Sequence, residues 1–236
     1  MGRFRIEFSK GPEVRFISHL ELMRSFERAL RRAGIPLAFS QGFNPHPKMA
    51  FASALAVGVT SEREYLDIEL KEDLDAREIL LSLNKSLPKG LYAKHCIPVR
   101  EKEPSLMAMV ALAEYQVKVK LLSSIEREKI ERAIKELMEK ESLVITRKGK
   151  KGLKEKEIRS GIFALNCTGI DERWVKFSLS VRAGSKGNIR PEEVLQVLKE
   201  IYHIPLAMDL IVIHRTGLFK KGQEELFGKH FSQSKE

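Results

Sequence analysis

Apolar and polar residues alternate with two different periods along the first hundred residues. Segments such as FRIEF at 4–8 and YLDIEL at 65–70 alternate at every second residue, which predicts strands. Segments with apolar residues three or four positions apart predict helices. The full order is strand, helix, strand, strand, helix, strand over residues 4–8, 20–33, 48–59, 65–70, 75–87 and 91–99. This βαββαβ order is typical of the ferredoxin-like fold, an antiparallel sheet with two helices on one face.

A related order follows a polar link at 101–107. It contains one strand more than the first half, with strands at 114–122, 143–147, 158–168, 174–181 and 208–214 and helices at 125–140 and 191–201. We therefore expect an α+β protein of two ferredoxin-like (βαββαβ-type) halves, with antiparallel sheets and helices packed on one face. The expected division is an N-terminal half at 1–105, a C-terminal α+β half at 106–222 and a polar tail at 223–236.

The helix at 20–33 has one apolar face and one arginine-rich face. Ser18 and Glu21 match a capping box, in which the serine caps the helix and the glutamate reaches back. Four arginines fall within an arc of about 100° opposite the apolar side chains, namely Arg24, Arg28, Arg31 and Arg32. Like charges four residues apart repel, so neighbouring acids or an external anion must offset them. The pattern is typical either of a solvated face with intrahelical ion pairs or of a face that binds phosphates.

The loop after this helix, SQGFNPHPK at 40–48, combines turn-forming residues with polar and aromatic side chains. Gly42 permits a positive φ, and the two prolines stiffen the loop. Such a loop favours stacking of Phe43 on a nucleic-acid base, while Gln41 and Asn44 meet hydrogen-bonding edges. We therefore interpret the loop as part of a binding site and not as a simple connection.

Two further segments are weaker candidates for anion binding. Residues 147–156 (RKGKKGLKEK) predict a basic hairpin tip, and residues 184–190 (GSKGNIR) precede a helix that starts at Pro191, where free amides favour a phosphate. Across all these segments, the residues expected to bind an anion or RNA are Arg15, His19, Arg24, Arg28, Arg31, Arg32, Ser40, Gln41, Gly42, Phe43, Asn44, His46, Lys48 and Arg190.

The formal net charge of +10 favours a polyanionic partner, although basic composition also serves solubility. No apolar run approaches the ~18 residues of a membrane span, and the N-terminal MGRFRIEFSK alternates like a strand, so we expect a cytoplasmic protein without a membrane partner. Cys96 and Cys167 lie far apart in apolar runs, and the histidines lack metal-like spacing. We therefore expect two buried thiols, no metal site and no cofactor bound by this chain itself.

The segment at 15–70, from RFISHLELM to EYLDIEL, resembles the signature of the radical-SAM-linked protein family of the DUF2344 type. Members of that family are separate proteins, or C-terminal domains, associated with a B12-binding radical SAM protein. The resemblance extends over the whole chain, although family members commonly have Asp at the position of Glu21. It implies an accessory role beside a radical SAM partner, in which the radical chemistry resides, and an association with RNA-processing functions.

Three hypotheses about function follow. The first is an accessory RNA-binding or substrate-presenting module that works with a radical SAM enzyme in the modification of tRNA or rRNA. It would have no independent activity, and catalytic residues are unknown. The second is a stand-alone RNA-modifying enzyme of pseudouridine-synthase-like architecture, which needs a catalytic aspartate in a basic cleft. The third is a protein–protein adaptor whose arginine face docks on the radical SAM partner.

Overall fold

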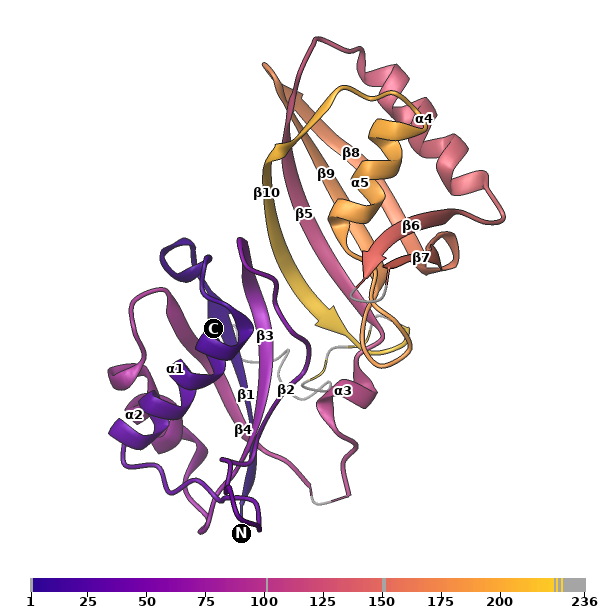
Figure 1. The fold of residues 1–236 in the computed structure, drawn as a ribbon. Coiled ribbons are helices and arrows are strands. Elements are labelled where there is room, and N and C mark those ends of the chain that lie inside the picture. Colours follow the sequence, from indigo (N-terminus) through magenta and orange to yellow (C-terminus); the bar gives the residue numbers. More distant parts are fainter. Residues whose placement is uncertain (1, 101, 150–151, 223, 225, 227–236) are drawn as a thin grey trace. The chain divides into compact units, whose positions relative to one another are not determined.

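The computed structural model describes residues 2–100, 102–149, 152–222, 224 and 226, and the chain forms two compact units (Figure 1). Unit 1 comprises Met1–Ala111 and Arg215–Glu236, and unit 2 comprises Leu112–His214. The long strand β10 (Leu206–Phe219) therefore contributes residues to both units. No helix in the described ranges is long and apolar enough to cross a membrane. Most of the predicted polar tail at 223–236 lies outside the described residues.

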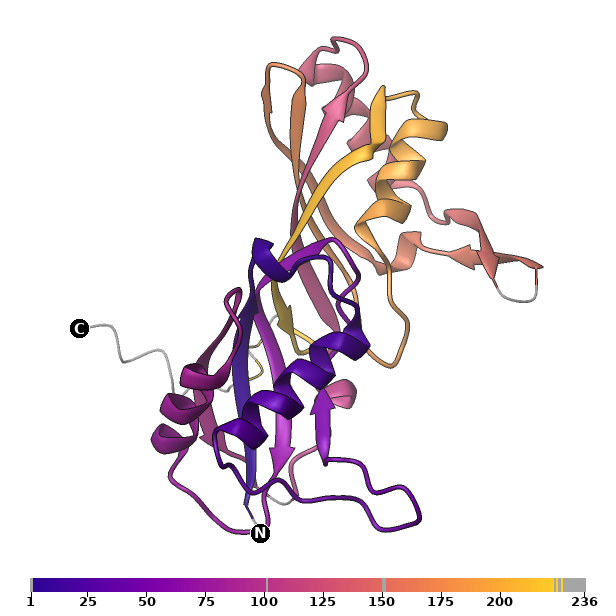
Figure 2. The same cartoon turned by 60° about the vertical axis from the view of Figure 1, so that its left-hand side comes forward.

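Unit 1 has the predicted βαββαβ order. Its elements are β1 (Arg3–Lys10), the 3-10 turn η1 (Pro12–Val14), α1 (His19–Arg32), β2 (Met49–Phe51), β3 (Val59–Glu69), α2 (Ala76–Ser86), β4 (Leu91–Pro98) and the short helix α3 (Leu106–Met109). In the sheet, β1 lies between β4 and β3 and is antiparallel to both, and β2 pairs antiparallel with β3. Helices α1 and α2 lie on the same face of this sheet, as Figure 2 shows. The arrangement confirms the ferredoxin-like prediction for the first half.

The apolar face predicted for α1 forms the centre of the core of unit 1. Its buried residues are Leu22, Phe26, Ala29 and Leu30. The ring of Phe26 lies 4.6 Å from that of Phe8 on β1 and 5.7 Å from that of Phe51 on β2, both in edge-on contacts. Because aromatic side chains bury the largest apolar area per residue, these contacts fix α1 on the sheet and turn its opposite face outward.

Unit 2 repeats the same topology with an inserted hairpin. Its elements are β5 (Leu112–Leu121), α4 (Arg127–Glu139), β6 (Val144–Gly149), β7 (Gly152–Glu157), the 3-10 turn η2 (Arg159–Gly161), β8 (Ile162–Asp171), β9 (Trp174–Arg182), α5 (Pro191–Glu200) and the first part of β10. The sheet order is β10-β5-β9-β8, and β9 is antiparallel to both β5 and β8. Helices α4 and α5 lie on one face of this sheet (Figure 1).

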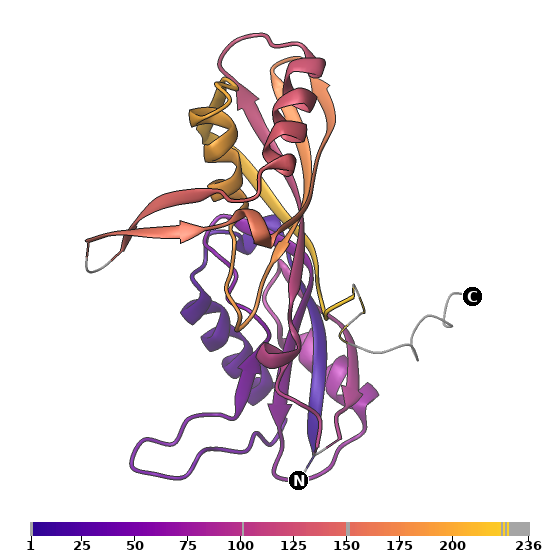
Figure 3. The same cartoon turned by 90° about the vertical axis from the view of Figure 1, so that its right-hand side faces the viewer.

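The strand predicted at 143–147 does not join this sheet. It is β6, which pairs only with β7 in a separate two-stranded hairpin that extends from unit 2 (Figure 3). The hairpin is rich in lysine and glutamate and most of its described residues are exposed, so it has no apolar face to bury against the sheet. The tip that the sequence marked as basic includes residues 150–151, which lie outside the described residues.

The prediction of one buried strand at 48–59 is wrong. Strand β2 ends at Phe51, and the chain turns before β3 starts at Val59. Gly58 has φ +85°, a conformation that side chains beyond glycine rarely adopt, and its amide donates to the carbonyl of Arg15. The small residues in this stretch therefore serve a turn that is tied to the start of α1, and not a strand.

Two buried ion pairs join neighbouring strands within unit 1. Arg5 of β1 donates to Asp67 of β3 at 2.8 Å, with side chains 1% and 4% exposed. Arg215 of β10 donates to both carboxylate oxygens of Glu64 on β3 at 2.6 Å, with side chains 2% and 3% exposed. Bidentate geometry offsets part of the large cost of burying two charges, whereas removal of one partner leaves the other charge in a dry environment.

We expect Glu64→Gln to lower the free energy of unfolding by about 3–5 kcal/mol, because buried Arg215 stays charged and loses its bidentate ion pair with Glu64. The matched control is Glu69→Gln, since Glu69 pairs with Lys48 where both side chains are about two-fifths exposed. That change should cost less than about 1 kcal/mol. Chemical denaturation of the two variants measures the difference, and equal small losses would contradict the role given to Arg215 and Glu64.

Candidate nucleic-acid interface

Helix α1 begins with the capping box that the sequence predicts. The amide of Glu21 donates to Oγ of Ser18 at 3.2 Å, and the amide of Ser18 donates to Oε2 of Glu21 at 2.6 Å. The backbone and side chain of Ser18 thereby hold the pKa of Glu21 below its usual range. This carboxylate is therefore engaged in starting the helix.

The arginine face of α1, formed by Arg24, Arg28, Arg31 and Arg32, is exposed along its whole length. Nη2 of Arg31 donates to Glu27 at 3.1 Å, and Nη2 of Arg32 donates to the carbonyl of Ser86 at 2.6 Å. Within the described part of the chain, Arg24 and Arg28 form neither a hydrogen bond nor an ion pair, although Glu21 lies close enough to sense the charge of Arg24. The structure thus shows partial intrahelical pairing, and binding of an external anion by the remaining guanidinium groups stays a prediction.

The loop that follows α1 is fixed at its base. Phe39 and Pro47 form an isolated antiparallel bridge, and the amide of Ser40 donates to the carbonyl of His46 at 2.9 Å. The amide of His46 donates in return to Oγ of Ser40 at 3.0 Å. Gly42 has φ +124°, the conformation for which glycine was expected there. The loop extends away from the sheet between α1 and β2, as Figure 2 shows.

The side chains of this loop divide into two groups. Ser40 and Lys48 stabilise its base, because Ser40 accepts the hydrogen bond from His46 and Lys48 pairs with Glu69 at 2.7 Å. The side chains nearer the tip are all exposed, namely Gln41, Phe43, Asn44 and His46. The ring of Phe43 is completely exposed. A fully exposed phenylalanine beyond the hydrogen-bonded base of the loop can offer both ring faces to a ligand.

Arg15 and His19 lie before and at the start of α1. The guanidinium of Arg15 stacks 4.4 Å from the ring of its neighbour Phe16, which is itself two-thirds exposed (66%). His19 is half-buried, with its ring 5.3 Å from that of Phe51, and burial lowers its pKa. Its Nδ1 atom forms no hydrogen bond within the described part of the chain. Arg15 is partly exposed, whereas His19 belongs partly to the core.

Buried Lys10 of β1 positions the segment that leads into α1, and the sequence analysis missed it. Nζ of Lys10 donates to the carbonyls of Arg15 and Ile17 at 3.0 and 3.5 Å, and burial lowers its pKa. Its neighbours include the buried pair of Glu64 and Arg215, whose charges act on it in opposite directions. The strand alternation of β1 could have revealed this role. Lys10 lies two residues after buried Phe8 and therefore faces inward as Phe8 does.

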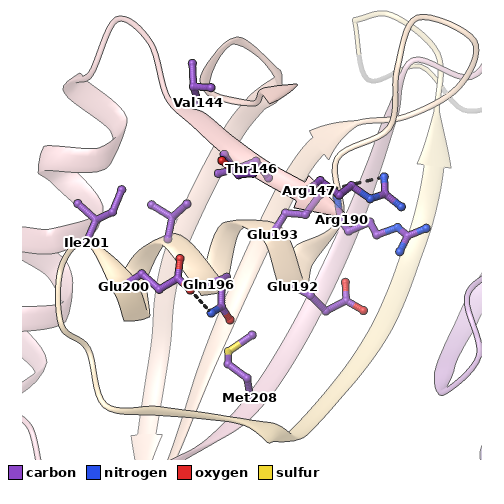
Figure 4. A pocket seen from close by; sticks show the side chains of 12 residues that line it. Val144, Thr146, Arg147, Arg190, Glu192, Glu193, Gln196, Glu200, Ile201 and Met208 are labelled. Atoms are coloured by element: carbon purple, nitrogen blue, oxygen red, sulfur yellow. Dashed lines mark hydrogen bonds and ion pairs between the residues drawn. The ribbon is translucent and has the colours of Figure 1, made fainter. Parts of the chain in front are cut away.

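The two weaker candidate segments meet in unit 2. Lys156 of the hairpin donates to the carbonyl of Asn188 at 2.7 Å and to Glu193 at 2.6 Å, and Arg147 lies 3.8 Å from Glu193. Arg147, Arg190 and Glu193 line a cavity of about 890 Å³ between β6 and α5, and Figure 4 shows the side chains around it. The amide of Arg190 donates to the same Glu193, which caps α5. Because a carboxylate already occupies this helix start, the geometry disfavours the phosphate cradle expected at 184–190.

The two cysteines are free thiols. Cys167 is buried and Cys96 is half-buried. Burial raises the pKa of Cys96 to about 12 and also raises that of Cys167. At neutral pH both stay protonated and behave as small apolar side chains.

Solved structures of similar fold cover almost the whole chain. A chain from the crystal structure of a Cbf5–Nop10–Gar1 complex matches 93% of it with a TM-score of 0.53 and 14% sequence identity. A chain from the structure of an H/ACA RNP bound to a substrate RNA containing 2'-deoxyuridine also matches 93%, with a TM-score of 0.50 and 14% identity. The present chain spans about half the length of these chains, 50% and 49%. At this identity the likeness shows a shared fold.

Comparison at the sequence level gives a family. No curated protein sequence matches the chain. The family described as "Uncharacterized protein conserved in bacteria (DUF2344)" matches residues 3–191, which is most of the chain. The protein therefore belongs to the DUF2344 family.

Proposed function

We propose that this protein binds single-stranded or looped RNA through the arginine face of α1 and the loop at 40–48. The observation that carries the proposal is the pairing of these two features on adjoining segments. One supplies guanidinium groups that the fold leaves partly or wholly without acidic partners, and the other supplies a completely exposed Phe43 on a loop whose base is hydrogen-bonded. Phosphate contacts from arginine and stacking of bases on aromatic side chains are the two main sources of affinity for single-stranded nucleic acid.

The chemistry of the surrounding residues supports RNA over a small anion. The net charge of +10 favours a polyanion, because each neutralised phosphate releases counterions. Gln41, Asn44 and His46 are exposed beside Phe43 and carry the donors and acceptors that base edges require. The similar solved chains come from complexes that include an H/ACA RNP with a substrate RNA, which agrees with an RNA ligand.

We further propose that the protein presents tRNA or rRNA to a radical SAM partner. The resemblance of the segment at 15–70 to radical-SAM-linked proteins motivates this assignment. In such a complex the partner supplies the radical chemistry, and this chain contributes affinity and orientation. Docking of the arginine face on an acidic surface of that partner is the adaptor alternative.

A stand-alone enzyme is the second candidate, because two ferredoxin-like units are also the architecture of pseudouridine synthases. That chemistry needs an aspartate available in a basic cleft. Asp67, the buried aspartate of unit 1, is held by Arg5 and Arg3 at 2.8 and 2.7 Å, and Glu21 is held by the capping box. The engaged state of both carboxylates favours binding over catalysis.

Replacement of the four arginines by alanine (R24A/R28A/R31A/R32A) should weaken RNA binding and reduce its dependence on salt. For single strands each lost phosphate contact lowers the slope of log affinity against log salt by about 0.7, so four contacts give up to about 3. Fluorescence anisotropy with labelled single-stranded RNA across a salt series measures both quantities, with duplex DNA as the competing ligand.

The matched control for that variant is R127A/K129A/R132A/K135A, which removes four positive charges from α4 in unit 2. It should leave most of the affinity intact. Equal weakening by both variants would mean that only overall charge matters. Wild-type protein that binds RNA and duplex DNA equally weakly would also contradict the proposal.

Phe43→Ala should reduce RNA affinity without a change in the salt slope, since stacking of one base on an aromatic ring contributes about 1–3 kcal/mol. Because the ring is completely exposed, the thermal stability of the variant should equal that of the wild type. Phe43→Tyr keeps an aromatic face and should retain affinity. Anisotropy titrations that show equal affinity for wild type and Phe43→Ala would exclude base stacking at this position.

A further inference from the structure

The sheet of unit 2 has one face that neither α4 nor α5 covers. The register of β5 and β9 places side chains of opposite character on its two sides. Val117, Val119 and Phe177 are buried, whereas the pairs Gln116 with Ser178 and Lys118 with Lys176 lie on the other side and are at least partly exposed. This second side is called the open sheet face below.

Two lysines lie directly opposite each other on the open sheet face. Lys118 of β5 and Lys176 of β9 are register partners. Directly opposed residues on antiparallel strands have Cβ atoms about 4.5–5.5 Å apart, so two like charges there destabilise the sheet. In the described ranges neither lysine has an acidic partner within ion-pair distance. The fold therefore tolerates an unfavourable pair of charges at the middle of this face.

Trp174 holds one of these charges in place. Nζ of Lys118 lies 4.8 Å from the centre of the Trp174 ring, within cation–π range. Trp174 is also the register partner of Lys120, so a third lysine lies on the same face. The contact orders the Lys118 side chain, which lowers the entropy that an incoming anion would have to remove.

The face is also hollowed at this point. A depression of about 380 Å³ is lined by both lysines together with Gln116, Thr168, Ser178 and His214. It thus combines ammonium groups with hydroxyl, amide and imidazole groups. Its lining also includes the apolar side chains Val117, Phe177 and Val212, of which Val212 is exposed. The two lysines fit a phosphodiester, and the polar and apolar groups beside them fit the adjoining sugar.

We propose that the open sheet face is a second RNA contact, in which a backbone phosphate lies between Lys118 and Lys176. This inference rests on the proposed RNA-binding function and adds a surface in unit 2 to the one in unit 1. The bound phosphate offsets the repulsion between the two lysines. The hydroxyl and amide groups of the depression hydrogen-bond to the adjoining ribose.

Lys176→Gln tests the assignment because it should raise the thermal stability of the protein and lower its affinity for RNA. Loss of one like charge should raise the melting temperature, while the contact of Lys118 with Trp174 stays intact. The same change should weaken binding of single-stranded RNA about fivefold at 0.1 M salt and lower the salt slope by about 0.7. If Lys176 had only a structural role, its replacement would lower the melting temperature or leave RNA binding unchanged.

The matched control is Lys129→Gln, which removes the same charge from α4 on the helical side of unit 2 and should change neither property. If the four-arginine variant loses RNA binding while Lys176→Gln binds as tightly as wild type, the open sheet face is not an RNA contact and the site in unit 1 still stands. If wild-type protein binds no RNA, both proposals fail. If Lys176→Gln weakens binding of polyglutamate as much as that of RNA, the face is a general acidic-protein surface and the RNA assignment is wrong.

Discussion

The bidentate pair between Arg215 and Glu64 is the interaction on which the arrangement of unit 1 depends. Both side chains are almost completely buried, so neither can exchange its partner for water. The pair joins the last residues of the long strand β10 to β3. Next to it, Lys10 donates to the carbonyls of Arg15 and Ile17 and so fixes the chain that leads into α1. The capping box at Ser18 then sets where the helix begins. The direction of the arginine face follows from these buried contacts together with the packing of Phe26.

The cations of this protein include buried arginines that contact a carboxylate and exposed cations that do not. The arginines inside unit 1, Arg5 and Arg215, each contact a carboxylate. By contrast, Arg24 and Arg28 on α1 and the two opposed lysines of the open sheet face have no such partner in the described ranges. Folding accounts for the first group, because an unpaired buried charge is costly. The positive charges of the second group repel one another, and this repulsion does not stabilise the fold. A bound polyanionic ligand would offset it.

Local patterns in the sequence predicted much of the fold. The βαββαβ order, the ferredoxin-like topology, the capping box and the two faces of α1 all depend on residues within one or two helical turns or on strand alternation. The strand expected at 48–59 failed because the small residues there serve a turn whose contact, Gly58 to Arg15, is distant in sequence. The strand predicted at 143–147 forms a separate hairpin, which the sequence did not reveal because pairing partners cannot be identified from one strand alone.

Part of the candidate site could also be predicted from local patterns in the sequence. The arginine face and the loop were predicted from adjacent residues, and the loop conformation at Gly42 agrees with the expectation. The network of Lys10, Glu64 and Arg215 was missed, because it brings together three strands from both ends of the chain. The opposition of Lys118 and Lys176 depends on strand register, and the sequence does not determine that register.

The most direct test of RNA binding by unit 1 is to locate the contact itself. Single-stranded RNA that carries 4-thiouridine would be photo-crosslinked to the full chain, and the crosslinked peptides would be identified by mass spectrometry. The account predicts crosslinks to the loop at 41–46, with Phe43 among the modified residues, that persist when heparin competes for nonspecific contacts. Crosslinks that avoid this loop, or that are scattered over lysine-rich surfaces and disappear with heparin, would contradict it.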